Sequence, residues 1–244
     1  MTSFLASQLP PPAEILELPE DELGLRLLRL IVDHGQGDLA SRNNVGIPST
    51  WDELGEEATT DEFLQVMVEA WDWLRVQRLV APRPGADAWD FVTRRGYRVL
   101  SAADGLALVR AEARLDVDLH RFIARRVRRQ FVLGEYELAA LAAMKQVEIR
   151  VRELARLAES DTGVPLMRKA FHPETGLLAD PSQEGGERQA TTDLFAGAIG
   201  VFKNPSSHRE VQFDDPTYAA EVVLFADLLL RMLDRVEQRL DVRD

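Results

Sequence analysis

The sequence has no cysteine, few aromatic residues (7%) and no apolar run that approaches membrane-spanning length. The absence of cysteine excludes a disulfide framework and thiolate metal sites, and it is typical of proteins of a reducing cytosol. A membrane-spanning helix needs about 20 consecutive apolar residues. The first residues also lack the basic-then-apolar pattern of a secretory signal. We therefore expect a cytoplasmic protein without a membrane partner.

Histidine is also scarce, and the four histidines lie far apart in the sequence: His34, His120, His172 and His208. The sequence contains no His-x-x-x-His pair and no carboxylate cluster with the spacing of metal ligands. It therefore predicts no metal site, and we expect no cofactor.

Positive charge is the third thing in short supply, because 41 acidic residues outnumber 29 basic ones and give a net charge of −12. The overall field of such a protein repels nucleic acid, so any contact with nucleic acid must come from a local basic patch. The hydrophobic content of 45% is ordinary for a globular protein and is enough to build a core.

The N-terminal part begins with residues 1–20, which are rich in proline and acidic residues and which we expect to form a flexible arm. A leucine-rich segment with helical spacing follows and ends at a glycine. Two Thr-x-x-Glu capping boxes come next, at Thr50 with Glu53 and at Thr59 with Glu62, and each predicts the start of a helix.

A hairpin pattern follows these helices. Extended runs flank the sequence PGAD at residues 84–87, and Thr93 has the position of an N-cap for a further helix. Three helices followed by a hairpin is the order of a winged helix. The stretch 77–100 resembles the wing and exit helix of many bacterial winged-helix proteins. The resemblance implies a winged helix-turn-helix domain with a small β-hairpin wing, which we expect over residues 21–112.

The charges of this domain leave two interpretations open. Its third helix carries the carboxylates Asp61, Glu62, Glu69 and Asp72. Carboxylates that face DNA phosphates at short range oppose binding. The wing region is more basic, and Arg94 and Arg95 are its candidate nucleic-acid-binding residues. The domain is therefore either a module for protein contacts or dimerisation, or a domain that binds through its wing alone. DNA is the less expected partner.

The rest of the chain, residues 113–244, has helical patterns almost throughout and predicts a helical bundle. Residues 134–159 form a long amphipathic pattern with an apolar seam, and the polar stretch 172–191 is expected to be a loop. Asp215 followed by Pro216 is a typical start for the last helix. The expected fold class is thus mainly α.

The clearest basic stripe lies at the start of this bundle, in the sequence HRFIARRVRRQF. It contains five arginines: Arg121, Arg125, Arg126, Arg128 and Arg129. Residues 121, 125, 128 and 129 share one helical face. Such a face could follow an RNA backbone. The alternative is that these arginines pair with carboxylates, within the chain or across a dimer.

A polar cluster stands between two apolar segments in the sequence VFKNPSSHRE, residues 201–210. Asn204 followed by Pro205 is a favoured helix start, so one interpretation is a structural cap with a surface histidine. The other interpretation is a phosphate site. Free N–H groups at a helix start favour an anion, Lys203 and Arg209 add positive charge, and His208 can move a proton near neutral pH.

The segment TDLFAGAIGVFKNPSSH, together with LMRKAF and the long helix GEYELAALAAMKQVEIRVREL, resembles the C-terminal domain of the Ymh family of uncharacterised prokaryotic proteins. That family is similar in turn to the HEPN superfamily, helical domains marked by Arg-Asn-x-x-x-His. HEPN domains are typically dimeric, metal-independent ribonucleases. The resemblance implies that His208 transfers a proton, that Asn204 orients the site, and that Lys203 stands where the family usually has arginine.

Two further points concern this implied site. Lysine offers one compact charge to a phosphate, whereas arginine offers a two-pronged fork, so the departure at Lys203 reduces the expected activity. HEPN domains often carry a polar residue on the equivalent of the long helix, which makes Glu148 a possible auxiliary residue. The alternative for Glu148 is an exposed, ion-paired helix face with Lys145 and Arg152.

Two functions follow from these observations. The first is a metal-independent RNA endonuclease, such as a toxin or defence effector, that acts as a homodimer on RNA. The second is a non-catalytic regulator or adaptor that dimerises through a HEPN-like bundle and binds nucleic acid or a protein partner through the winged helix.

Overall fold

The computed structural model describes residues 4–34, 40–203 and 215–242 and is mainly helical, with one small β-hairpin. Its contacts divide the chain into two compact units, Met1–Val109 and Arg110–Asp244. The boundary expected after residue 112 falls inside helix α7 (Gly105–Leu115), which spans this division. The expectation of a mainly α fold is confirmed.

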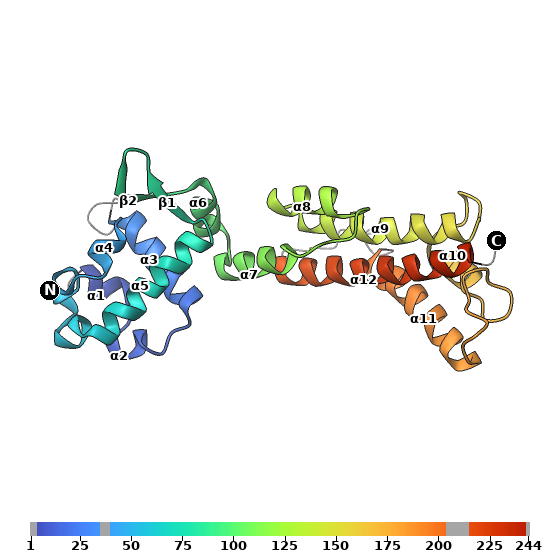
Figure 1. The fold of residues 1–244 in the computed structure, drawn as a ribbon, viewed down its shortest axis with the longest axis horizontal. Helices are drawn as coiled ribbons and strands as arrows, with labels where there is room; N and C mark the ends of the chain where they lie inside the picture. Colours follow the sequence, from blue (N-terminus) through green and yellow to red (C-terminus); the bar gives the residue numbers. More distant parts are fainter. Residues whose placement is uncertain (1–3, 35–39, 204–214, 243–244) are drawn as a thin grey trace. The chain divides into compact units, whose positions relative to one another are not determined.

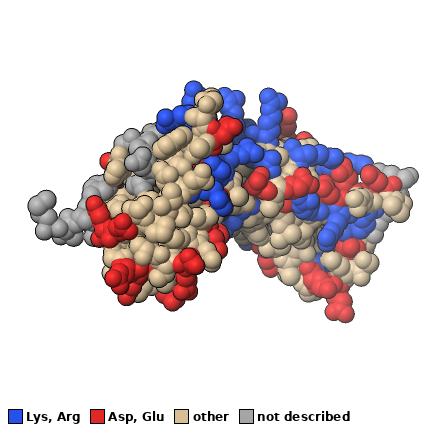
Figure 2. All heavy atoms as spheres, turned by 60° about the vertical axis from the view of Figure 1, so that its left-hand side comes forward, with Lys and Arg blue, Asp and Glu red and all other residues tan. Residues whose placement is uncertain are grey.

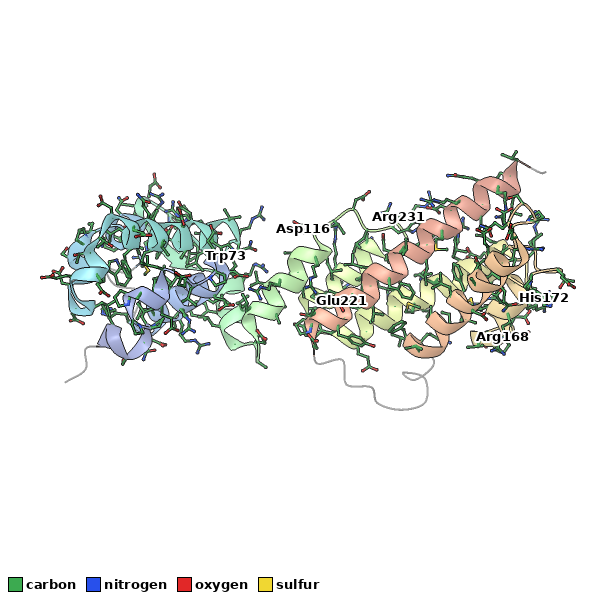
Figure 3. All side chains as sticks on the ribbon, turned by 90° about the horizontal axis from the view of Figure 1, so that it is seen from below. Trp73, Asp116, Arg168, His172, Glu221 and Arg231 are labelled. Carbon is green, nitrogen blue, oxygen red and sulfur yellow. The ribbon has the colours of Figure 1, made fainter. Side chains whose placement is uncertain are left out.

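The N-terminal unit is built around the packing of α3 (Glu20–Asp33) against α5 (Asp61–Val76) (Figure 1). Both helices bury one apolar face, as their helical spacing predicts. The buried side chains include Leu23, Leu27, Leu28 and Ile31 on α3 and Phe63, Met67, Trp71 and Leu74 on α5. The two helices approach closely at Gly24, where a Cβ atom would lie 2.5 Å from a ring carbon of Trp73, which Figure 3 labels.

The described part of residues 1–20 is not a flexible arm, which corrects that expectation. It forms the short helices α1 (Phe4–Gln8) and α2 (Pro12–Ile15), and the side chains of Leu5, Leu9 and Ile15 are buried. Each of these apolar side chains gains about 1.5–3 kcal/mol from such burial, which offsets the cost of ordering the segment.

The segment between α3 and α5 is less regular than its capping boxes predict. After α4 (Arg42–Val45) it forms three 3₁₀ turns: η1 (Pro48–Thr50), η2 (Asp52–Leu54) and η3 (Glu56–Thr59). Gly55 has φ 97° and interrupts any continuous helix.

The two Thr-x-x-Glu capping boxes also act differently from the prediction. Thr50 donates its hydroxyl hydrogen to the carbonyl of Asn44 and caps nothing. The cap of α5 is Thr60, which accepts from the amide of Phe63, because Thr59 belongs to the last 3₁₀ turn.

The hairpin and its following helix agree with the sequence. Strands β1 (Val80–Arg83) and β2 (Ala86–Val92) pair antiparallel, and Gly85 takes φ 75° in the turn. Thr93 caps α6 (Arg94–Ser101) by accepting from the amide of Gly96. The hairpin and the helix after it thus lie where the sequence predicts them, while the likeness to winged-helix proteins stays a prediction.

The C-terminal unit places α9 (Tyr136–Leu154) beside α12 (Pro216–Asp241), with α8 (Ala124–Val132) packed on α9 (Figure 1). Most of the seam expected on α9 is buried, including Ala140, Ala143, Val147 and Val151. Asp215 caps α12 through the amide of Thr217, as its position before Pro216 predicts.

Helices α10 (Gly163–Ala170) and α11 (Gly185–Phe202) pack on each other and contact α9. The start of α11 corrects the expectation of a loop over residues 172–191. Glu184 and Glu187 form a capping box there, and its polar first turns carry no apolar pattern that would reveal a helix in the sequence. None of the described helices is long and apolar enough to span a membrane.

Candidate functional site

The central feature of the C-terminal unit is a buried ion pair between α9 and the end of α11. Glu148, in the middle of α9, is only 4% exposed. Its Oε2 lies 3.4 Å from Nζ of Lys203, the residue that follows α11. The side chain of Lys203 is 20% exposed, so the pair reaches the surface on the lysine side.

A third element completes the surroundings of Glu148. The same Oε2 accepts a hydrogen bond of 2.8 Å from the amide of Gly163, the first residue of α10. Gly163 has φ 65°, a conformation that glycine adopts at little cost. A carboxylate at a helix N-terminus interacts favourably with the helix dipole. Three helices thus meet at one carboxylate, and that carboxylate holds Lys203.

The interpretation of Glu148 as part of an exposed helix face is therefore wrong. Lys145 is exposed, and Arg152 donates to the carbonyl of Glu159 instead of pairing with Glu148. The reason is that Glu148 lies on the side of α9 that α10 and α11 cover. The structure brings together two of the predicted residues, Glu148 and Lys203. Asn204, His208 and Arg209 lie outside the described residues.

The arginines of the basic stripe near α8 are exposed. This holds for Arg121, Arg125, Arg126, Arg128 and Arg129. Within the described part of the chain, none of the five forms an ion pair with a carboxylate. Arg128 donates instead to the carbonyl of Val117, and Arg121 lies over the ring of Phe122 at 5.1 Å. The described carboxylates therefore leave this basic face free to meet an anion.

The two predicted arginines after the hairpin differ in their surroundings. Arg94 is exposed, whereas Arg95 is half-buried and its Nε donates to the carbonyl of Gln77, just after α5. Burial lowers the pKa of Arg95, and the positive charges of Arg98 and Arg78 lower it further. Arg95 thus has a structural contact at the end of α5 in addition to its charge.

Two polar clusters were not found from the sequence. In the N-terminal unit, Asp90 on β2 is 1% exposed and accepts from Nε1 of Trp71 and from both Nε and a terminal nitrogen of Arg75, at 2.9 to 3.0 Å. The only signal in the sequence is an aspartate inside a strand, where this residue type is disfavoured.

In the C-terminal unit, His120 is buried and its Nε2 lies 3.0 Å from Oδ2 of Asp234. The His120 amide donates to Asp227, which also binds Arg231, labelled on α12 in Figure 3. Phe122 donates its amide hydrogen to Nδ1 of His120. Both ring nitrogens are thus engaged, so this cluster fixes the segment before α8 on α12 and leaves the imidazole no free nitrogen for chemistry.

The described residues contain no group of three or more His, Cys, Asp or Glu side chains that could hold a metal ion. The fold and the Glu148–Lys203 pair define the class of the molecule as a two-unit, mainly helical protein whose C-terminal bundle encloses a carboxylate–ammonium pair.

The comparison with protein families identifies that bundle. Residues 117–233 match the family model Hypoth_Ymh, described as a protein of unknown function, so the chain contains a Ymh family domain. The resemblance to the Ymh family is thus confirmed. No curated protein and no solved structure matches the chain.

Proposed function

We propose that the C-terminal unit is a metal-independent RNA endonuclease of HEPN type, active in the cytoplasm as a homodimer. One observation carries the proposal: the buried carboxylate of Glu148 holds the ammonium group of Lys203, the residue directly before Asn204 in the sequence. His208 follows five residues after Lys203. The resemblance assigns the chemistry to these three residues, and the observed pair fixes the position of the first.

The reaction needs only groups that this chain supplies. His208 accepts the proton of a ribose 2′-OH, whose oxygen attacks the adjacent phosphorus. The bond from phosphorus to the 5′-oxygen breaks, and the leaving oxygen receives the proton, which yields a 2′,3′-cyclic phosphate and a 5′-hydroxyl. Lys203 compensates the negative charge that develops on the phosphoryl oxygens. Glu148 holds this cation beside the implied site.

The five arginines of the basic stripe, Arg121 and four residues of α8, also support the proposal. Their five exposed guanidinium groups provide the local positive surface that an acidic protein needs to bind RNA. Cleavage of cellular RNA would make the protein a toxin or a defence effector.

The test is an RNA cleavage assay in EDTA with wild type, His208→Ala and, as a matched control, His172→Ala. His172 is an exposed histidine of the same unit, where its ring accepts two local backbone hydrogen bonds. We expect wild type and His172→Ala to cut RNA, His208→Ala to be inert, and a substrate with 2′-deoxyribose at the cleaved position to survive. Cleavage by His208→Ala at the wild-type rate would falsify the site.

A second function is favoured by the same exposed arginines. A HEPN-like bundle that binds nucleic acid without cutting it would need the basic face and not His208. This binder would show no cleavage at any enzyme concentration. It would still show salt-dependent RNA binding that is lost when Arg125 and Arg129 are both replaced by Gln.

A further inference from the structure

A second basic cluster lies in the N-terminal unit, at the base of the hairpin. Arg78 follows α5, and Arg94 and Arg95 open α6. Thr93 ties the two segments together, because its hydroxyl donates to the carbonyl of Arg78 at 2.7 Å and its amide donates to the carbonyl of Leu79 at 2.9 Å. Arg78, Arg94 and Arg95 are therefore neighbours in space, and we call them the hairpin-base arginines.

This arrangement costs stability. The first turn of α6 contains Arg94 and Arg95 and no acidic residue, although the positive end of a helix favours acidic side chains. Arg78 has φ 55°, a left-handed conformation that is strained for a non-glycine residue. The positive charges of Arg78 and Arg98 disfavour the charge on Arg95. A cluster of cations that repel one another is stabilised when an anion binds between them.

The acidic residues of α5 do not cancel this cluster. Asp61 and Glu62 stand at the start of α5, about 25 Å along the helix from Arg78. That distance is about three Debye lengths at physiological ionic strength. Glu69 is exposed and stands about 14 Å along the helix from Arg78, beyond the Debye length of about 8 Å. Asp72 is nearer, but Arg42 binds it at 2.6 Å. On the face that Figure 2 shows, blue side chains gather along the top of the left-hand part, and red ones lie mostly along its lower edge. The objection that carboxylates on α5 oppose phosphate binding therefore fails for the end of this helix.

The dimensions of the basic region indicate a polymer. Arg83, at the end of β1, is also exposed and stands about 16 Å along the chain from Arg78. A small anion would contact either Arg83 or the hairpin-base arginines, but not both. A nucleic-acid duplex presents about nine backbone charges over the same length, and guanidinium groups bind phosphate through paired hydrogen bonds.

We propose that the hairpin-base arginines bind the phosphate backbone of a nucleic acid. This site is separate from the ribonuclease site and does not depend on it. The chemistry it recognises is the repeating phosphodiester, which RNA and DNA share, so duplex RNA, duplex DNA and single-stranded RNA are the three probes.

The experiment measures the anisotropy of labelled oligonucleotides of each kind at several salt concentrations. The protein carries His208→Ala to prevent cleavage. Arg78→Gln with Arg94→Gln removes two contacts and spares Arg95, which also binds Gln77. The control, Arg26→Gln with Arg235→Gln, removes the same charge from two other exposed positions.

For at least one probe, we expect the Arg78/Arg94 variant to lower the slope of log affinity against log salt by about two, whereas the control keeps the wild-type slope. The probe that responds identifies the nucleic acid. Equal slopes in the variant and the control for all three probes overturn the proposal. Polyglutamate serves as a further, acidic probe. If the Arg78/Arg94 variant loses binding to polyglutamate but not to the nucleic acids, the proposal is overturned and the partner is an acidic protein. A separate assay measures RNA cleavage in EDTA by the Arg78/Arg94 variant that retains His208. The binding assay thus tests the hairpin-base arginines, the cleavage assay tests the ribonuclease site, and either proposal can be wrong without the other.

Discussion

Asp90 in the N-terminal unit and Glu148 in the C-terminal unit are both buried carboxylates, but their partners differ. Asp90, in the N-terminal unit, receives three hydrogen bonds of 2.9 to 3.0 Å from Trp71 and Arg75. Glu148, in the C-terminal unit, receives one good hydrogen bond from Gly163 and a looser contact of 3.4 Å from Lys203. The first carboxylate is saturated by a rigid, bidentate partner. The second is held by a single flexible ammonium that is partly open to solvent.

This difference distinguishes a site that only stabilises the fold from a site whose cation is still able to contact a ligand. A saturated buried ion has nothing left to offer a ligand, and its partners fix the hairpin on α5. A loosely paired ammonium can turn toward a phosphate and return, because lysine is a compact charge on a flexible stem. The comparison thus assigns stability to Asp90, whereas Glu148 with Lys203 is the pair on which the proposed function depends.

The largest effect is expected from Asp90→Ala, which tests the structural role of the first carboxylate. The substitution leaves the indole N–H of Trp71 buried without its acceptor and removes both hydrogen bonds from Arg75. We expect the free energy of unfolding of the N-terminal unit to fall by about 3 kcal/mol, the usual cost of breaking a buried charge pair. Urea unfolding followed by tryptophan fluorescence measures it, since all four tryptophans lie in this unit. Asp87→Ala, an exposed position on the same strand, is the control and should change little.

The next experiment compares the coupling within each pair. Double-mutant cycles of Asp90→Asn with Arg75→Gln and of Glu148→Gln with Lys203→Met give the two coupling energies. We expect about 2 kcal/mol for the first cycle and about 1 kcal/mol or less for the second, because the second contact is longer and partly solvated. A larger coupling for Glu148 with Lys203 would reverse the assignment of structural and functional roles.

A functional counterpart follows from the second pair. Glu148→Gln keeps an acceptor for the Gly163 amide and removes the charge that holds Lys203. We expect RNA cleavage to fall about tenfold to a hundredfold with little change in folding, since a misplaced transition-state contact costs about 1–3 kcal/mol. Lys203→Arg should retain cleavage or raise it, because arginine offers two donors to the phosphoryl oxygens. The single-turnover rate in EDTA is the measurement, and an unchanged rate in Glu148→Gln would make the pair merely structural.

The outcome at these sites shows what local sequence can and cannot predict. The hairpin at residues 84–87, the Thr93 cap and the Asp215–Pro216 helix start were predicted correctly, because each depends on the conformational preferences of adjacent residues. The pairing of Glu148 with Lys203 was not, because it joins residues on different helices, and helical spacing alone pointed to Lys145 and Arg152 instead.

The same limit applies to the buried polar clusters. Asp90 meets Trp71 and Arg75 across 15 to 19 positions of sequence, and His120 meets Asp234 across 114. A pattern of hydrophobic residues predicts which face of an element is buried, but it contains no information on which polar side chains will meet there. Only the packing of the elements determines that.

The smallest effect concerns an exposed pair near the saturated site. Arg42 binds Asp72, and their side chains are 42% and 45% exposed. Hydrogen bonding from Arg42, assisted by its charge, lowers the pKa of Asp72 below its ordinary value. A lowered pKa in the folded state means that the pair contributes its stability above the unfolded pKa of about 3.9 and loses it as the pH falls through the folded pKa. Solvent screening limits the contribution to less than about 1 kcal/mol.

Urea unfolding of wild type and Arg42→Gln, near neutral pH and at roughly pH 3, measures this contribution. We expect the two proteins to differ slightly in free energy of unfolding at neutral pH and to converge in acid, with Arg26→Gln as the control. A difference that stays constant across this range would mean that Arg42 acts through packing of its aliphatic stem. In that case the pair would resemble neither buried carboxylate, since its charge would play no part in folding.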